Sequence, residues 1–395
     1  MKRISTYHKF WIIVLFIVFL SDSICPCTSF AVYFNNTYYG LNLDWQNTEI
    51  KFSIKRFEGY KVFYVEFLSN GSWLTSCGFN ERGLLATSQL VYPGVAATLK
   101  PNELPLDYGG LFRVSTDFFG RVDTLKTFLK STNNRLIQVP FIKLHSLVAS
   151  KDGSAAVFES GADSNMITNT GENFIVMTNF NNHKFWGKPY TLTTGTGSDR
   201  YQSAYAYITQ NNLNFTYENA WEVLKRTKQT SGSYPTICSF IFDPLNRSVY
   251  IAIKRNYEQI YKVSLIDNYI ETFSGFTTYT KLNLTNEGIL ASELVNLTEI
   301  NETTQTNNYS FNLEQNYPNP FNPETNITFS LDKSEYVTLK IYDLLGNEIT
   351  TLIDKYIPAG NHQLSWNAKD NKSGIYFYRL QTLNKSITKK MIYLK

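Results

Sequence analysis

Cys27 and Asp44 are the residues whose types and spacing most directly suggest chemistry. Residues 28–34 alternate between large apolar and smaller or polar side chains, which predicts a strand, and Asn35-Asn36 favours a tight turn after it. A hairpin loop of only these two residues places Cys27 directly opposite Asp44, with Cβ atoms about 5 Å apart. The hairpin therefore predicts a carboxylate beside the thiol at the start of the strand.

A free α-amino group on Cys27 would turn this pair into a self-contained catalytic unit. Such an amine has a pKa of roughly 7.7–8.0 and can take the proton of its own thiol, whose ordinary pKa is about 8.5. The Asp44 carboxylate would hold the ammonium form in place. The alternative is a buried strand thiol near an unrelated carboxylate, and the hairpin alone favours neither interpretation.

The first 23 residues predict an export signal, which brings Cys27 close to the mature N-terminus. Three basic residues among the first nine precede an unbroken apolar run at 10–20, which is too short to cross a bilayer as a helix. Ser23 is small enough for cleavage after it. A lipoprotein-type cleavage before Cys25 fits less well, because the residues ahead of it do not match the small residues that such processing requires.

Cleavage after Ser23 leaves residues 24–26 ahead of Cys27 as a short propeptide. Signal peptidase is not expected to cut directly after Pro26, so a second step is needed. We expect the Cys27 thiol to attack the Pro26 carbonyl and release the tripeptide autocatalytically.

Length and composition favour two globular domains joined by a polar linker. The chain has 395 residues, of which 43% are hydrophobic and 18% charged, enough to bury more than one core. Residues 296–315 are rich in polar residues and read as the linker. The net charge of +4 is mild and interspersed, which argues against a nucleic-acid partner. No ligand spacing or glycine-rich loop predicts a metal site or a cofactor.

Strand-like runs alternate with a few helical ones from Cys27 to about residue 285. The expected strands are Thr28–Phe34, Lys61–Phe67, Ala155–Glu159, Phe174–Met177, Cys238–Phe242 and Ser248–Ile253. The expected helices are Tyr217–Thr227 and Asp123–Lys130, the second with Asp123 as its N-cap. After the linker, short strands separated by turn residues predict a small β-sandwich: Asn326–Leu331, Tyr336–Tyr342, Glu348–Leu352, Asn361–Trp366, Gly374–Gln381 and Ile387–Leu394.

The other cysteines and the histidines near these strands predict little chemistry. Cys77 and Cys238 either form a disulfide or stay as two buried free thiols. His145 lies in an apolar, strand-like context and is expected to be a hydrogen-bonded core histidine. His183 lies in an Asn-rich loop and is expected to face solvent.

Short motifs between Cys27 and Ile253 follow one another in a recognisable order. They are Cys27-Thr-Ser-Phe30, Gly40–Trp45, Gly78–Leu84, Leu144-His145, Asp152-Gly153, Val157–Glu159, Val176–Asn179, Ser198–Tyr201 and Thr236–Ser239 with Asp243. This ordered set resembles the linear amide C–N hydrolases, the choloylglycine hydrolase and penicillin V acylase group of the N-terminal nucleophile hydrolases. The resemblance implies an α+β fold, an αββα four-layer sandwich, for residues 27–295.

The resemblance also implies roles for particular residues. Cys27 would attack the amide carbonyl, and Asp44 would hold its α-amine. Asn179 and a backbone N–H would stabilise the oxyanion of the tetrahedral intermediate. Arg200 would orient catalytic or substrate groups.

Two positions depart from the pattern of this family. The family usually has arginine where this chain has Leu41, and that arginine lies against the nucleophile and favours its thiolate. Without this arginine, three alternatives are open: the pKa of the Cys27 thiol is raised, the enzyme acts on a different substrate, or the protein is an inactive homologue. A substrate-binding position that is often Asn or Tyr falls on Gln89, which can donate a hydrogen bond, or on Leu90, which cannot.

The C-terminal unit carries a second set of motifs. They are Tyr317–Pro323, Val337–Asp343, Leu345-Gly346, Gly360, Trp366, Ser373–Tyr378 and Lys389-Lys-Met391. This set resembles the type A C-terminal sorting domain of the type IX secretion system, with an Ig-like β-sandwich over residues 316–395. The resemblance implies the secretion machinery as a partner. A carbohydrate-binding sandwich is the alternative, but no aromatic platform for a sugar is evident.

Together these patterns predict a secreted or cell-surface enzyme of a Gram-negative bacterium, exported through the periplasm. Its expected activity is hydrolysis of a small-molecule linear amide of the bile-salt, penicillin V or N-acyl amino-acid type, through a thioester. Acyl transfer from the same site is the first alternative. A catalytically inactive binding protein is the second, motivated by Leu41.

Overall fold

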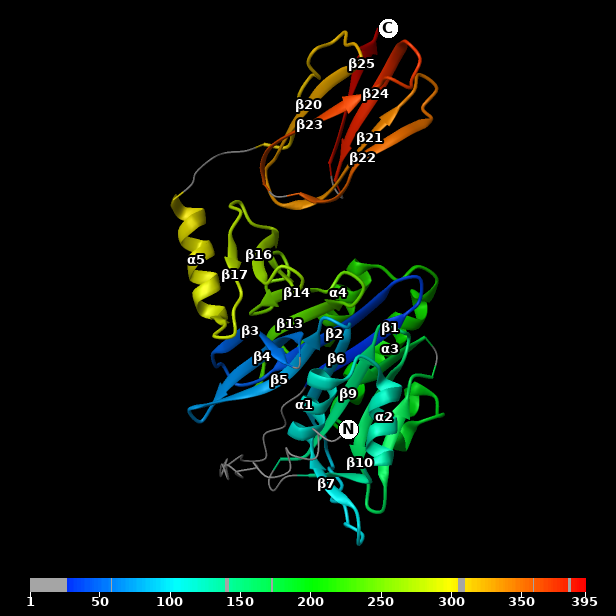
Figure 1. Cartoon of the computed structure of the whole chain (residues 1–395), viewed down its shortest axis with the longest axis vertical. Helices are drawn as coiled ribbons and strands as arrows, with labels where there is room; N and C mark the ends of the chain where they lie inside the picture. Colours follow the sequence, from blue (N-terminus) through cyan, green and yellow to red (C-terminus); the bar gives the residue numbers. More distant parts are fainter. Residues whose placement is uncertain are drawn as a thin grey trace.

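The chain folds as a four-layer α+β unit followed by a small β-sandwich (Figure 1). A computed structural model describes residues 27–57, 59–138, 142–171, 173–304, 310–357, 359–382 and 385–395. The expected signal peptide at 1–23 and propeptide at 24–26 lie outside these residues. None of the helices in the described ranges is both long and apolar enough to span a membrane.

The first sheet carries Cys27 at the start of its second strand. Its eight antiparallel strands lie in the order β12-β1-β2-β13-β14-β15-β16-β17. Their bounds are β1 (Thr28–Tyr33), β2 (Thr37–Asp44), β12 (Phe174–Met177), β13 (Thr236–Asp243), β14 (Ser248–Ile253), β15 (Ile260–Ser264), β16 (Tyr269–Ser274) and β17 (Lys281–Asn283).

The second sheet faces the first and also contains eight antiparallel strands, in the order β11-β10-β9-β6-β5-β4-β3-β18. Their bounds are β3 (Ile50–Phe57), β4 (Tyr60–Ser69), β5 (Ser72–Asn80), β6 (Leu84–Leu90), β9 (Leu144–Ser150), β10 (Ala155–Ser160), β11 (Asn165–Asn169) and β18 (Ile289–Leu290). Two short strands, β7 (Leu104–Asp107) and β8 (Asn134–Ile137), form a separate parallel pair.

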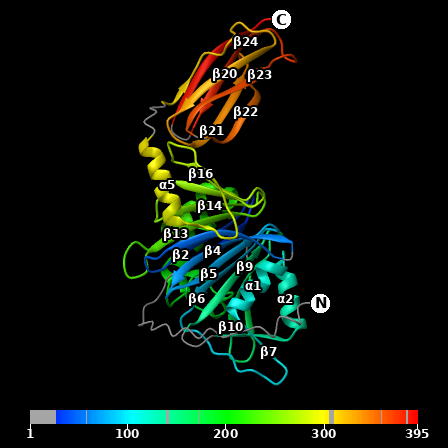
Figure 2. The same ribbon diagram turned by 60° about the vertical axis from the view of Figure 1, so that its left-hand side comes forward.

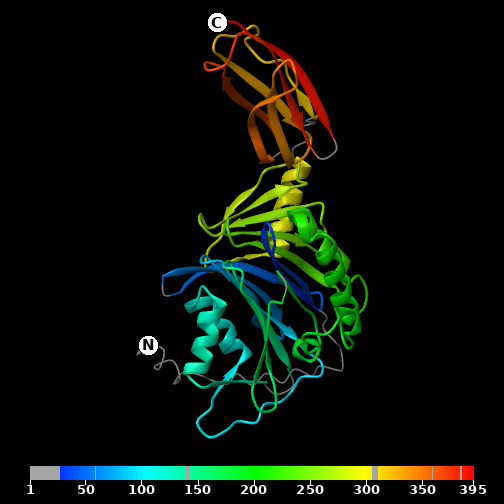
Figure 3. The same ribbon diagram turned by 90° about the vertical axis from the view of Figure 1, so that its right-hand side faces the viewer.

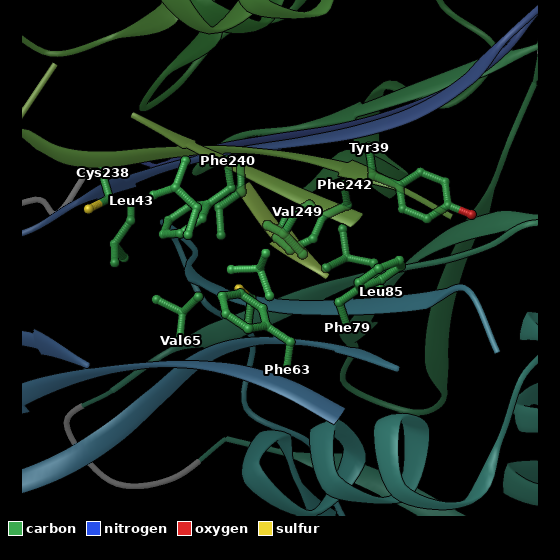
Figure 4. Packing of buried hydrophobic residues seen from close by; sticks show 14 of the residues in the cluster. Tyr39, Leu43, Phe63, Val65, Phe79, Leu85, Cys238, Phe240, Phe242 and Val249 are labelled. Atoms are coloured by element: carbon green, nitrogen blue, oxygen red, sulfur yellow. The ribbon is translucent and has the colours of Figure 1, made fainter. Parts of the chain in front are cut away.

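The main core lies between the two sheets, where alternate residues of facing strands interdigitate. Figure 4 shows Leu43 and Phe240 of the first sheet pointing toward Phe63 and Val65 of the second. Cys27 belongs to the same cluster, so its side chain lies on the inner face of the first sheet. The alternation of β1 therefore directs the thiol between the sheets and its neighbour Thr28 away from them.

Helices cover the outer face of each sheet and complete the four layers (Figure 3). The second sheet packs against α1 (Tyr108–Phe118) and α2 (Val122–Ser131). The first packs against α3 (Ser198–Gln210) and α4 (Tyr217–Thr227), where Thr216 and Asn219 form a capping box. The predicted αββα fold class is confirmed. The prediction of Asp123 as an N-cap is wrong, because Arg121 holds that position and Asp123 lies in the first turn.

The hairpin that carries Cys27 differs from its prediction by one residue. β1 and β2 pair Tyr33 with Thr37, which leaves residues 34–36 as a three-residue loop. Continuing this register places Cys27 opposite the residue before Asp44. The predicted direct pairing of the thiol and the carboxylate is therefore wrong.

The register follows from the packing of the partly buried Phe34 side chain. Its ring packs against Phe174 and Phe215, with ring centroids 6.0 Å apart in each case. Asn36 Nδ2 donates to Phe215 O at 3.0 Å and ties the loop to the same segment. These contacts withdraw Phe34 from the ladder, so the loop gains one residue.

The segment predicted as a linker begins with a helix. α5 spans Ala291–Thr304, so residues 296–304 are helical rather than irregular. The apolar side chains of Ala291 and Leu294 explain this, because they are buried in the core between the sheets. Figure 2 shows α5 alongside the first unit, with the β-sandwich beyond its C-terminal end.

The C-terminal unit is an all-β sandwich of two antiparallel sheets, as predicted for an Ig-like domain. The sheets have the orders β19-β20-β23 and β22-β21-β24-β25 and enclose their own core. The strands are β19 (Asn312–Leu313), β20 (Glu324–Leu331), β21 (Glu335–Tyr342), β22 (Glu348–Ile357), β23 (Gly360–Asn367), β24 (Gly374–Gln381) and β25 (Ser386–Tyr393). Main-chain hydrogen bonds from Gly275 N to Ser334 O and from Ser334 N to Phe276 O join the two units, at 3.0 and 3.4 Å.

Candidate active site

Cys27 lies where several strand ends meet at one end of the sandwich. It directly precedes β1, and its main-chain N–H donates to Asn179 Oδ1 at 3.0 Å. Its thiol lies 3.6 Å from the main-chain oxygen of Asp44, the last residue of β2. The residue is 6% exposed. The thiol is therefore held between the sheets at the rim of the core.

Arg200 holds the main chain around Cys27 from the helix side of the sheet. Its Nη1 donates to Cys27 O at 2.6 Å and to Thr28 Oγ1 at 2.9 Å, and its Nη2 donates to Asn179 Oδ1 at 2.7 Å. The planar guanidinium suits this set because its N–H groups have a fixed geometry. Arg200 thus joins the nucleophile candidate and the predicted oxyanion asparagine in one buried network.

The start of α3 delivers Arg200 to this position. Gly197, directly ahead of the helix, has φ of +78°, and a Cβ there would lie 2.4 Å from Arg200 Nη2. Thr178 Oγ1 donates to Gly197 O at 3.0 Å and fixes the turn. A glycine at this position is therefore required both by the backbone and by the guanidinium.

Asn179 and the end of β6 form the next wall of the site. Asn179 Oδ1 accepts from Cys27 and Arg200, while its Nδ2 donates to Leu90 O at 2.7 Å. Gln89 is 2% exposed and donates through Nε2 to Ser29 Oγ, which links the two sheets. The predicted substrate-binding residues Gln89 and Leu90 therefore lie beside the predicted catalytic residues.

Asp44 is fully buried, and its carboxylate is surrounded by groups of both signs. Thr236 Oγ1 donates to Asp44 Oδ1. Burial raises the pKa of Asp44 well above its usual range, and the Cys27 sulfur adds to this rise. The Thr236 hydrogen bond and the guanidinium groups of Arg200 and Arg255 act in the opposite direction. The carboxylate of Asp44 thus responds electrostatically to Cys27 despite the shifted register.

Glu159 organises a second buried network behind Asn179. Its carboxylate accepts from His145 Nδ1 at 3.2 Å and from His183 Nδ1 at 2.9 Å, and from the main-chain N–H groups of Asn182 and His183. His145 Nε2 donates to Thr178 O at 2.7 Å. Burial would raise the pKa of Glu159, but the hydrogen bonds from both histidines, the charge of His145 and the main-chain N–H of His183 together outweigh it and lower the pKa to about 2.

This network confirms one histidine prediction and corrects the other. His145 is a fully buried, hydrogen-bonded core residue, as its apolar context predicts. His183 does not simply face solvent, because Glu159 attracts its imidazole across 24 residues of sequence. The Asn-rich composition around His183 gives no sign of that distant carboxylate.

The remaining positions considered in the sequence, Leu41, Cys77 and Cys238, lie buried in the core between the sheets. Leu41 is 1% exposed and packs in the core between the sheets, so it supplies no charge to the thiol. Cys77 and Cys238 are free and fully buried, which confirms the second of the two alternatives for these residues. Burial raises the pKa of both thiols.

Sequence reasoning missed two residues that contact the Asp44 region. Thr236 marks a predicted motif strand, but its hydroxyl contact with Asp44 spans 192 residues and has no local signature. Arg255 follows β14 and donates through Nη1 to Thr236 O at 2.8 Å. A polar residue at the first position of a strand that is buried along its whole length is the signal that could have drawn attention to Thr236.

The C-terminal unit has a clear match among known families. Residues 315–394 match the family model described as "Secretion system C-terminal sorting domain". This unit is a secretion sorting domain. It indicates secretion or attachment at the cell surface.

Solved structures that resemble the chain cover its N-terminal unit. An arginine-to-leucine variant of conjugated bile acid hydrolase from Clostridium perfringens has a TM-score of 0.48 and 16% identity, and the match covers 66% of this chain and 98% of that one. Penicillin V acylase from Agrobacterium tumefaciens has a TM-score of 0.47 and 14% identity, with 67% and 93% covered. A search among curated proteins finds no match.

Proposed function

We propose that this chain is a secreted hydrolase of linear amides and that the mature Cys27 is its nucleophile. The observation that carries the proposal is the convergence on one cysteine of Asn179 on its nitrogen, at 3.0 Å, and Arg200 on its carbonyl, at 2.6 Å. A structural cysteine does not require a buried guanidinium on its main chain. The substrate would be a small non-peptide amide of the bile-salt, penicillin V or N-acyl amino-acid type.

The reaction would begin with proton transfer from the Cys27 thiol to its own α-amine. The thiolate attacks the amide carbonyl carbon, and the C–S bond forms as the carbonyl oxygen becomes an oxyanion. Collapse of this intermediate breaks the C–N bond, and the amine leaves with the proton. Water then attacks the thioester, which releases the carboxylic acid and restores the thiol. Each step needs one base that alternately accepts and returns a proton, and the α-amine supplies it.

Three surrounding residues would position the reacting groups and stabilise the charges that form. Arg200 fixes the main chain of Cys27, so the amine and the thiol keep one geometry. Asn179 Oδ1 accepts from the nitrogen of Cys27. One N–H of its amide nitrogen donates to Leu90 O, and the second N–H would stabilise the oxyanion. The Asp44 carboxylate would balance the ammonium form of the amine.

Maturation would use the same thiol. Attack of Cys27 Sγ on the Pro26 carbonyl carbon gives a thioester and frees the α-amine, and water then releases the tripeptide as its carboxylic acid. Intact-mass measurement of the exported protein tests this step. A mature chain that starts at Ile24 would contradict both the maturation and the nucleophile proposals.

Export would proceed through the type IX secretion machinery, which the C-terminal sorting domain serves. Such a route takes the protein across the periplasm to the surface or the medium of a Gram-negative bacterium. The substrate would then be an extracellular small molecule.

The decisive experiment compares matured protein with Cys27→Ala on a panel of amides with apolar acyl groups. We expect turnover by the parent protein and none by the variant. Added amine nucleophiles distinguish acyl transfer, because they would divert the thioester to a new amide. No turnover by a protein whose mass shows an exposed Cys27 would favour the inactive binding protein, for which Leu41 is the motivating residue.

A further inference from the structure

Arg255 is tied to the Asp44 carboxylate through a single intermediate residue. Its Nη1 donates to Thr236 O at 2.8 Å, and Thr236 Oγ1 donates to Asp44 Oδ1. Thr236 also pairs with Asp44 across β13 and β2. The Arg255 guanidinium therefore holds Thr236 in place, and Thr236 in turn holds the Asp44 carboxylate.

The backbone directs Arg255 toward this position. Lys254 and Arg255 follow β14 with φ values of 51° and 62°, a left-handed conformation that is uncommon for residues other than glycine. Lys254 N donates to Ile237 O at 2.8 Å, which holds the turn against the start of β13. Two successive left-handed residues are costly, and they turn the Arg255 side chain back over the site.

Arg255 is one of several charged or ionisable groups that act on the Asp44 carboxylate. The Cys27 sulfur lies directly before β1 and the Tyr257 hydroxyl comes from beyond β14, and both are groups whose negative forms oppose ionisation of the carboxylate. Arg200 from α3 and Arg255 are the cations that favour it. Arg200 is engaged with the main chain of Cys27, whereas the guanidinium of Arg255 donates to Thr236, the residue that holds the Asp44 carboxylate.

We propose that Arg255 is a positioning residue that keeps Asp44 available as a charged partner for the amine of mature Cys27. This inference rests on the proposed function of Cys27. Arg255 touches neither substrate nor reacting atoms in this role, and it acts through Thr236 and through its charge. A purely structural residue would only fasten the turn after β14.

The dependence of kcat/KM on pH separates the two roles. Replacement of Arg255 by Gln should move the acid limb of the profile to higher pH by at most about one pH unit, because a cation that favours the charged form of Asp44 through Thr236 is lost. Arg255→Lys keeps the charge and should leave the limb in place. A uniform fall in rate at every pH, without movement of the limb, would overturn the proposal.

Arg247 provides a matched control. It also has a left-handed backbone, with φ of 53°, and its Nε donates to the main-chain oxygen of Glu81 at 3.0 Å. It lies in the turn between β13 and β14, at the other end of this hairpin from Arg255. Arg247→Gln should therefore change stability without moving the pH profile.

A thermodynamic cycle tests the same coupling without any enzymatic activity. Arg255→Gln is combined with Asp44→Asn, and urea unfolding is measured from about pH 4 to about pH 9. Because burial raises the folded pKa of Asp44, the charged fraction of its carboxylate grows as the pH rises. Arg255→Gln should therefore become more destabilising as the pH rises, and only when Asp44 is present.

The two experiments fail in distinguishable ways. Absence of turnover with intact coupling in the unfolding cycle would reject the hydrolase but keep the Arg255–Asp44 relation. An effect of Arg255→Gln that is the same at every pH and in the Asp44→Asn background would reject the relation itself.

Discussion

Replacement of Glu159 by Gln is the perturbation whose consequence is easiest to derive from the structure. The carboxylate is 1% exposed and accepts hydrogen bonds from two imidazoles and two main-chain N–H groups. A glutamine side chain can accept at only one of its two terminal atoms and carries no charge. Its amide nitrogen would face a donor in at least one of these contacts. We therefore expect the variant to be less stable at neutral pH.

The magnitude follows from the shift in protonation of Glu159. Its pKa falls from 4.5 to about 2, roughly 2.5 units, and one unit corresponds to about 1.4 kcal/mol, which gives about 3 kcal/mol. A carboxylate with a depressed folded pKa contributes its full stabilisation above the unfolded value. That contribution is lost as the pH falls from about 4.5 through about 2.

Urea unfolding followed by tryptophan fluorescence measures this effect. The parent protein should lose about 3 kcal/mol between neutral pH and about pH 2 beyond what Glu159→Gln loses. Glu222→Gln is the control, because Glu222 is 37% exposed and its ion pair with Arg226 should contribute at most about 1 kcal/mol. A Glu159→Gln variant within about 1 kcal/mol of the parent at neutral pH, or one with an unchanged pH dependence, would contradict a stabilising role of the Glu159 carboxylate.

Three further predictions follow from other parts of the molecule. Gly40→Ala places a Cβ 2.1 Å from Phe30 Cε1, so thermal unfolding should show a loss of about 1–3 kcal/mol, and an unchanged midpoint would contradict this packing. Arg200→Lys keeps the charge but cannot hold three acceptors in one plane, so turnover or precursor processing should slow by about 10- to 100-fold, as measured by assay and intact mass. A chain that ends before residue 310 lacks the sorting domain and should accumulate in the periplasm on cell fractionation, whereas Lys340→Gln in the full chain should be exported normally.

The sequence predicted correctly those elements whose hydrophobic pattern is complete within the segment itself. β12, β14 and α4 have the predicted bounds because strand alternation and one amphipathic face are complete within each segment. The hairpin loop failed because its length depends on Phe34, whose partners lie more than a hundred residues away. The start of the linker failed for the same reason, since the contacts that stabilise α5 lie in the core of the first unit.

In the candidate site, too, residues within sequence motifs were predictable, and a residue placed only by distant contacts was not. Motif order pointed to Cys27, Asn179 and Arg200, and these residues contact one another in the structure. Arg255 has no motif, and its relation to the site exists only because β14 returns it to the start of β13. A contact of this kind carries no periodicity, so a single sequence offers no means of finding it.

The sequence separation of the contacts around Cys27 has a consequence for the timing of the proposed maturation. Its nitrogen is held by a residue 152 positions later and its carbonyl by one 173 positions later. These surroundings cannot exist until the strands and helices between them have assembled. A cysteine that cleaves itself free in such a setting would be inactive in a partly folded chain. The fraction of protein that has lost its leading residues would then be a direct gauge of how much of it has folded correctly.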